Sequence, residues 1–151
     1  AQLGHYPAGS DQSVVNMAPA DYVAWALVEL SLKKESLGRA FHLCNPKSLP
    51  LSEVLGYVTS FGVPLKPLSY IDWVRLLKQD KSNVLWPLSS SFRESEDGTL
   101  LGQDVVYSCA ECLRELTQVS SDQYAITPEV FHRYLEFYRK IGFVPAAISK
   151  N

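Results

Sequence analysis

Most of the 151-residue sequence consists of segments whose apolar residues recur at helical spacing, and only two short runs in it could form β-strands. A β-strand is stable only when it pairs with other strands, so a chain with so few of them must be mainly helical. Apolar residues make up 46% of the chain and charged residues 20%, which allows a sizeable core and excludes disordered and fibrous classes. We therefore expect a mainly α fold with a few short β-strands, forming a single lobe over residues 1–151.

Local signals indicate where the helices begin and end. Ser69 and Asp72 form a capping-box pair ahead of an apolar run, and Pro128 suits a first helical turn. Gly62 and Gly142 follow two of the periodic segments and are expected to end them in a left-handed conformation. The predicted helices cover residues 19–33, 51–61, 70–79 and 128–141, and a Ser108/Glu111 box predicts a short one over 108–116.

The two strand candidates are residues 40–44 and 63–68, and neither has an evident partner in the chain. The second contains two prolines and is expected at a sheet edge. Residues 1–18 have no hydrophobic period and are expected to form an irregular opening loop, and residues 83–92 at most a short or broken helix. The most polar stretch, residues 93–103, is the expected mobile loop.

Charge and composition exclude several classes of partner and location. A net charge of -2 is too small to favour nucleic acid or an anionic membrane surface. No apolar stretch approaches the roughly 18–20 residues that a membrane span needs. Three cysteines, an odd number, favour a reducing compartment over a disulfide framework, so a cytoplasmic protein is expected. The first residues lack both an initiator Met and signal-peptide features, which suggests an internal boundary and hence a fragment.

A search for catalytic motifs finds no complete active site. There is no Gly-rich phosphate or dinucleotide loop, no G-x-S-x-G, and no Tyr followed four residues later by Lys. Cys109 and Cys112 form a C-x-x-C without a second pair, so we interpret them as small packed side chains and expect no metal site. The predicted catalytic and metal-binding residues are therefore none.

The three histidines differ in context. His42 lies in the apolar strand candidate and is expected in the core, whereas His132 is expected on a solvated helix face. His5, in the opening segment, is the only histidine placed where a substrate could pass.

A resemblance to a known family rests on several short motifs in a fixed order. The motifs are Gly4-His5-Tyr6-Pro7, Val15-Asn16-Met17-Ala18-Pro19-Ala20-Asp21-Tyr22-Val23-Ala24, Ala40-Phe41-His42-Leu43-Cys44-Asn45-Pro46, Tyr70-x-x-Trp73 and Gly142-Phe143-Val144-Pro145. In this order they resemble the C-terminal part of thioester reductase domains of the extended short-chain dehydrogenase/reductase superfamily. Such domains occur in nonribosomal peptide synthetases, polyketide synthases and carboxylic acid reductases. Ala18 and Ala20 replace the family's usual valines, a mild loss of packing volume.

The resemblance implies an enzyme of two lobes. Its N-terminal Rossmann lobe binds NADPH and carries the catalytic residues, which lie upstream of this chain, so no catalytic or cofactor-binding role transfers to a residue here. The enzyme would release an acyl or peptidyl thioester from the phosphopantetheine arm of a carrier protein as an aldehyde or alcohol. This chain would be the C-terminal helical lobe, which binds substrate and carrier protein. It would lack the Rossmann core and be inactive alone, without bound NADPH.

Within this chain, Tyr6, Pro7, Asn16 and Met17 are predicted to line the substrate cleft, since they lie in the irregular opening segment beside the family motifs. The alternative stays open that Asn16 merely caps the first helix and Tyr6 packs on Trp25. At the level of function, the alternative is a helical adaptor without enzymatic activity that binds a carrier protein or a neighbouring domain. In either case an isolated lobe is expected to expose an apolar face and to dimerise through it.

Overall fold

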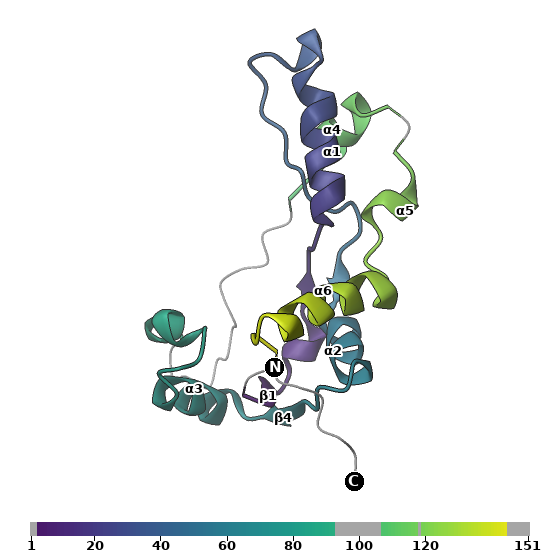
Figure 1. The fold of residues 1–151 in the computed structure, drawn as a ribbon. Helices are drawn as coiled ribbons and strands as arrows, with labels where there is room; N and C mark the ends of the chain where they lie inside the picture. Colours follow the sequence, from purple (N-terminus) through teal and green to yellow (C-terminus); the bar gives the residue numbers. More distant parts are fainter. Residues whose placement is uncertain (1–2, 93–106, 118, 145–151) are drawn as a thin grey trace. The chain divides into compact units, whose positions relative to one another are not determined.

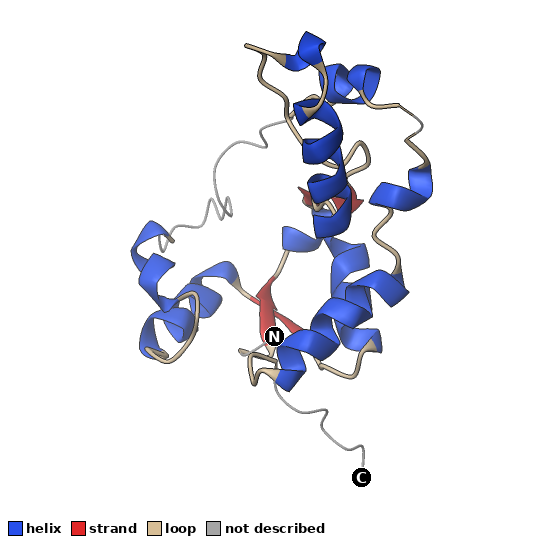
Figure 2. Ribbon diagram, turned by 45° about the horizontal axis from the view of Figure 1, so that its top comes forward, coloured by secondary structure: helices blue, strands red, loops and turns tan. Residues whose placement is uncertain are grey.

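The structure is a computed structural model that describes residues 3–92, 107–117 and 119–144. These residues form α-helices joined by 3-10 helices (η) and a few short strands, so the expected mainly α fold is confirmed (Figures 1 and 2). The helices are α1 (Ala20–Ser31), α2 (Leu51–Ser60), α3 (Tyr70–Gln79), α4 (Ala110–Glu115), α5 (Ser121–Tyr124) and α6 (Pro128–Lys140), with η1 (Ser10–Gln12), η2 (Lys34–Ser36) and η3 (Trp86–Ser91). The strands are β1 (His5–Pro7), β2 (Val14–Val15), β3 (Leu49–Pro50) and β4 (Lys66–Leu68).

The chain divides into two compact units. The first unit comprises residues 1–13, 50–104 and 128–151, and the second comprises residues 14–49 and 105–127. The expectation that residues 1–151 form a single lobe stays a prediction. The chain passes between the units several times, and no linker composition marks the crossings. The predicted mobile loop, residues 93–103, lies outside the described residues.

The long helices form where local signals predicted them. Helices α1, α2, α3 and α6 fall within the predicted ranges or within a residue of their limits. The Ser69 Oγ accepts a hydrogen bond from the Asp72 N–H at 3.2 Å, as the capping pair at the start of α3 predicted. Gly62 and Gly142 have φ values of 90° and 77°, the left-handed conformation expected at these helix ends.

Two sequence predictions about strands are wrong. Residues 40–44 have no strand structure, because no described segment offers them a continuous row of backbone hydrogen bonds. The second candidate forms only β4, and it is not without a partner. It pairs in parallel with β1, with His5 opposite Lys66 and Pro7 opposite Leu68.

The opening segment is consequently more ordered than predicted. Residues 1–18 were expected to be irregular, yet β1, η1 and β2 lie within them. Strand β2 pairs with β3 in a second two-stranded sheet. These pairings join residues far apart in sequence, and three or fewer residues per strand leave no detectable hydrophobic period.

The capping box predicted for α4 is also misplaced. Ser108 accepts from the Ala110 N–H at 3.3 Å, but the N-cap residue is Cys109 and no side chain caps the helix. A true box occurs at α5, where Ser120 and Gln123 cap each other's backbone N–H groups. The short helix itself was predicted correctly.

The first unit has two apolar clusters. Trp73, Val74, Leu77 and Phe92 form one, in which the Trp73 and Phe92 rings meet edge to face with centroids 5.4 Å apart. Val63, Leu135 and Val144 form the other, where α2 and α6 lie side by side (Figure 1). The second unit has its own cluster of Ala26, Leu30, Cys112 and Leu116, which packs α1 against α4.

Candidate functional site

Tyr6 and Pro7 lie on β1 in the first unit. The Pro7 side chain is buried, its carbonyl accepts a hydrogen bond of 2.6 Å from Ser10 Oγ, and Tyr6 is half-buried. The Ala8 N–H donates to the Leu68 carbonyl at 2.7 Å and extends the pairing of β1 with β4. The opening segment thus presents Tyr6 from a hydrogen-bonded strand.

Asn16 and Met17 lie in the second unit, where a buried asparagine holds them. The Asn16 amide Nδ2 donates to the Asn45 carbonyl at 2.8 Å, and its Oδ1 accepts from the Asn45 N–H at 3.0 Å. The side chain of Asn16 therefore pairs with the Asn45 backbone as a neighbouring strand would. The N-cap of α1 is Pro19, with no side-chain hydrogen bond, so the alternative that Asn16 caps this helix is wrong.

Asn45 itself is 4% exposed and connects three segments. Its Nδ2 donates to the Met17 carbonyl at 2.8 Å and to the Tyr124 carbonyl at 2.6 Å. Its Oδ1 accepts from the Lys47 N–H at 2.8 Å. Every polar atom of the side chain is paired, as a buried amide requires. The sequence analysis did not single out this residue. Its position between an apolar run and a proline was a signal that could have identified it.

The other part of that alternative, packing of Tyr6 on Trp25, stays a prediction. Tyr6 and Trp25 belong to different units. Within the second unit, the Trp25 ring lies 6.4 Å from the ring of Tyr22, measured between centroids.

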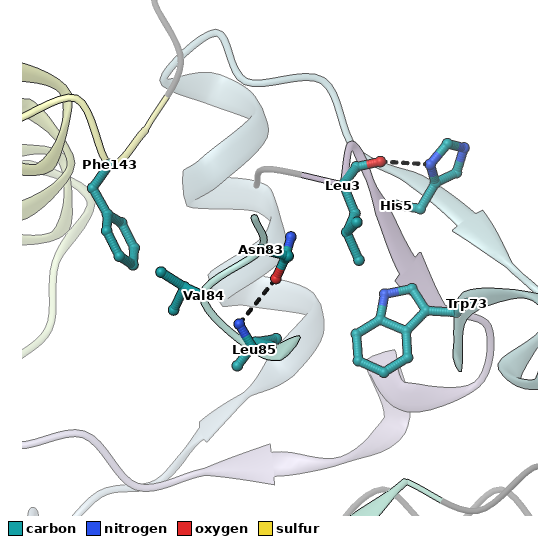
Figure 3. Close-up of a pocket in the computed structure, with 7 residues that line it drawn as sticks. All are labelled: Leu3, His5, Trp73, Asn83, Val84, Leu85 and Phe143. Atoms are coloured by element: carbon teal, nitrogen blue, oxygen red, sulfur yellow. Dashed lines mark hydrogen bonds between the residues drawn. The ribbon is translucent and has the colours of Figure 1, made fainter. Parts of the chain in front are cut away.

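A pocket with a volume of about 250 Å³ lies within the first unit (Figure 3). Its lining comes from the segment before β1 and the first residue of β1, from α3, from the turn before η3 and from the segment after α6: Leu3, His5, Trp73, Asn83, Val84, Leu85 and Phe143. His5 is the one histidine that sequence reasoning placed near a substrate path, and it lines this pocket. Tyr6 and Pro7 do not appear in the lining, and Asn16 and Met17 belong to the other unit.

The other two histidines do not follow their predictions. His42 is exposed, and its ring lies 5.5 Å from that of Tyr107, so it is not a core residue. His132 is half-buried on α6 and its Nε2 lies 2.9 Å from the Tyr57 carbonyl, so it joins α6 to α2 where a solvated position was expected. Both predictions were wrong because the burial of a single histidine depends on which distant segments pack beside it.

The three cysteines gather around Tyr22 in the second unit. Cys112 is fully buried in the apolar cluster, as its interpretation as a packed side chain predicted. Burial raises the pKa of the Cys44 thiol, and the neighbouring Cys109 adds a smaller effect in the same direction. Burial likewise raises the pKa of Cys112. Thiols with raised pKa values stay protonated at neutral pH and are weak nucleophiles. Among the described residues, no group of three or more His, Cys, Asp or Glu side chains could hold a metal ion.

Tyr22 lies at the centre of this group with 2% of its surface exposed. Its hydroxyl has no well-aligned hydrogen-bond partner within the described part of the chain. Burial, with smaller contributions from the cysteines, raises its pKa to about 12. The raised pKa values of Tyr22, Cys44 and Cys112 favour the uncharged form of these three groups at neutral pH.

The described strands lack the turn that a Rossmann dinucleotide-binding site needs. A Rossmann site needs a strand that runs through a glycine-rich turn into a helix. The strands described here have two or three residues each, and β3 and β4 pass into α2 and α3 without an intervening glycine. No helix in the same ranges has the length and apolarity needed to cross a membrane.

No protein-family model matches the chain. It is 25% identical over 134 residues to a component of the linear gramicidin synthase of Brevibacillus parabrevis, an alignment that covers 85% of this chain and 3% of that protein. It is 28% identical over 157 residues to L-2-aminoadipate reductase of Saccharomyces cerevisiae, covering 95% of this chain and 11% of that one. The chain thus spans a small part of these relatives.

Two solved structures share the fold. The terminal R domain from the myxalamid PKS-NRPS biosynthetic pathway superposes with a TM-score of 0.77 at 26% identity, covering 97% of this chain and 38% of that one. A thiolation-reductase didomain from an archaeal non-ribosomal peptide synthetase superposes with a TM-score of 0.63 at 16% identity, covering 94% and 29%. In sequence and fold, the chain is similar to the C-terminal part of terminal reductase domains, as the motifs indicated.

Proposed function

From this likeness to the C-terminal part of terminal reductase domains, we propose that the chain is the lobe that binds substrate and carrier protein in an NADPH-dependent thioester reductase. The enzyme would release an acyl or peptidyl chain from its carrier protein as an aldehyde or, after a second reduction, as an alcohol. NADPH would bind to a separate N-terminal Rossmann lobe, since the described residues of this chain do not fit it. The setting would be the cytoplasm.

The observation that carries the proposal is the match to the myxalamid R domain, which extends over 97% of this chain. A lobe of this kind contributes to hydride transfer by holding the thioester in position and keeping water away. Its residues act on orientation and not on the bond that breaks. We therefore assign no catalytic residue to this chain.

Tyr6, Pro7, Asn16 and Met17 are proposed to line the path of the substrate. Support comes from their placement on ordered segments: β1 is hydrogen-bonded to β4, and Asn45 holds residues 16 and 17. Within its own unit, each pair of residues would be held in one geometry before binding, which reduces the entropy lost on binding.

The proposed partners are the Rossmann lobe and a carrier protein with its phosphopantetheine arm. One structural relative is itself a thiolation-reductase didomain, which supports a carrier protein as partner. Exposed apolar side chains also favour a partner surface: Leu27, Val28 and Leu32 around α1 are 56–79% exposed, and Phe137 and Ile141 around α6 are 59% and 58% exposed. We propose that the Rossmann lobe covers such faces, and that the isolated chain dimerises through one of them.

A chimera tests the proposed function. In it, this chain replaces the aligned part of the myxalamid R domain, and NADPH consumption is followed with a carrier-bound acyl thioester. We expect thioester-dependent NADPH oxidation and release of an aldehyde or alcohol. The myxalamid domain truncated before the replaced part is the control and should bind NADPH without reducing the thioester.

The contradicting result is a chimera that folds by circular dichroism and binds NADPH, yet reduces no carrier-bound thioester. If this chain nevertheless bound a holo-carrier protein, a non-enzymatic adaptor would be the better assignment.

A further inference from the structure

We propose that the pocket of the first unit, whose lining includes none of the four residues predicted to line the cleft, binds the apolar part of the acyl chain. The inference rests on the proposed function, because it takes the ligand to be the acyl group of a thioester substrate. The lining residues are those of Figure 3.

The walls are apolar and come from well-separated parts of the sequence. Leu3 and Trp73 form one side, and Val84, Leu85 and Phe143 lie across from them (Figure 3). Trp73 is 5% exposed and belongs to an apolar cluster, so this side of the pocket is rigid. Val84, Leu85 and Phe143 are 50%, 37% and 40% exposed, so a ligand here would remove apolar surface from water.

The polar groups of the lining offer a charged ligand few hydrogen-bond or ion-pair partners. Within the described part of the chain, no Asp, Glu, Lys or Arg lines the pocket. Asn83 is 6% exposed and its Oδ1 accepts from the Leu85 N–H at 3.0 Å. His5 lies at the edge and its Nδ1 donates to the Leu3 carbonyl at 2.8 Å, as the dashed line in Figure 3 marks. A phosphate or carboxylate would lose its hydration without gaining a partner.

The volume limits the size of the ligand. An apolar cavity of about 150 Å³ is large enough for benzene. The pocket of about 250 Å³ therefore fits an alkyl chain of roughly eight carbons or one substituted aromatic ring. The amides and hydroxyl of pantetheine would lie unpaired against these walls, so the acyl group is the part of the thioester that the pocket selects.

The test is binding of octanoyl-pantetheine to the full chain, measured by calorimetry and by the tryptophan indole signals in NMR spectra. We expect octanoyl-pantetheine to bind and to shift the Trp73 signal more than that of Trp25, which lies in the second unit. Pantetheine alone should bind at least about tenfold more weakly.

Two matched substitutions locate the site. Val84→Arg places a charge at the pocket wall and should weaken octanoyl-pantetheine binding by at least about tenfold. Leu88→Arg changes a side chain of similar exposure, 55% against 50%, that lies nearby on η3 outside the lining, and it should leave affinity within about twofold. If Val84→Arg alters the circular dichroism spectrum, Phe143→Arg replaces it.

The pocket assignment is overturned if octanoyl-pantetheine does not bind, or if it binds the native chain and a folded pocket variant equally. It is also overturned if the chimera reduces octanoyl and acetyl thioesters with a preference that Val84→Arg leaves unchanged, in which case the proposed function stands. An inactive chimera, combined with octanoyl-pantetheine binding that Val84→Arg abolishes, instead contradicts the proposed function and leaves the apolar site in place.

Discussion

At the scale of single residues, two buried polar side chains show how context decides a role. Asn45 is buried with every polar atom paired, and it holds the Met17 and Tyr124 carbonyls. Tyr22 is equally buried, but its hydroxyl lacks a well-aligned partner among the described residues. A paired buried group is costly to remove, whereas an unpaired one is cheap to remove. The two residues should therefore respond in opposite ways to substitution.

Asn45→Ala is expected to lower the free energy of unfolding by about 2–4 kcal/mol, because it leaves buried carbonyl and N–H groups without partners. Urea denaturation measures this loss. Asn16→Ala is the comparison: Asn16 is exposed, so water can replace its hydrogen bonds, and the cost should stay below about 1 kcal/mol. Equal effects of the two substitutions would contradict the role given to Asn45.

Tyr22→Phe is expected to leave stability at neutral pH unchanged or to raise it by up to about 1 kcal/mol, because it removes a buried hydroxyl that has no well-aligned partner among the described residues. Folding raises the pKa of Tyr22 from 10.0 to about 12. Ionisation of Tyr22 is therefore easier in the unfolded protein, so this residue gives stability no pH dependence below pH 10 and lowers it as the pH rises towards 12.

The substitution should reduce this alkaline loss, measured as the urea midpoint against pH. Some loss should persist, because burial and the hydrogen bond to Glu53 also raise the pKa of Tyr57 to about 12. An unchanged alkaline slope in Tyr22→Phe would show that the Tyr22 hydroxyl ionises as easily in the folded protein as in the unfolded one.

At the scale of elements, local capping and tertiary packing contribute separately. Helix α3 begins with a side-chain cap from Ser69, whereas α1 and α2 begin at Pro19 and Pro50 without one. Between elements, Arg39 donates to Glu115 at 2.6 Å and to Glu111 at 2.8 Å, which ties the segment after η2 to α4. Because these ion pairs are largely exposed, packing of Cys112 and Leu116 on α1 contributes more to this junction.

Ser69→Ala is expected to destabilise the first unit by about 1 kcal/mol through loss of the α3 cap. Ser69→Thr should restore most of this loss, because Thr keeps the hydroxyl that accepts from the Asp72 N–H and donates to the Asp72 carboxylate. Ser52→Ala, at an exposed site in the first turn of α2, is the control and should change stability by no more than about 0.5 kcal/mol. The measurement is the thermal midpoint by circular dichroism; equal shifts for Ser69→Ala and Ser52→Ala would argue against the cap.

At the scale of the whole molecule, the chain has separate apolar clusters in its two units and connects the units four times, near residues 13, 49, 104 and 127. It covers 38% of the myxalamid R domain, so the activity proposed here is one of a whole reductase domain and is not assigned to these residues alone. The apolar faces around α1 and α6 are where the proposed Rossmann lobe would contact this chain.

The chain alone is expected not to bind NADPH, since its described strands lack the glycine-rich turn that a dinucleotide needs. Calorimetry with NADPH measures this, with the chimera as the positive control. Tight binding by the 151-residue chain would place cofactor contacts within it and overturn the division of roles proposed between the two lobes.

The amino-acid sequence by itself determined the long helices and their ends, because the spacing of apolar residues, the Ser69 cap and the left-handed glycines act within a few residues of one another. It also showed the likeness to reductase domains, through short motifs that follow one another in a fixed order along the chain. Only the tertiary structure decided the pairing of β1 with β4, the pocket, and the junction at Asn45, whose partners lie 28 and 79 residues away. Such contacts depend on where distant segments meet. A single polar side chain forms no repeating pattern in the sequence from which its partner could be predicted.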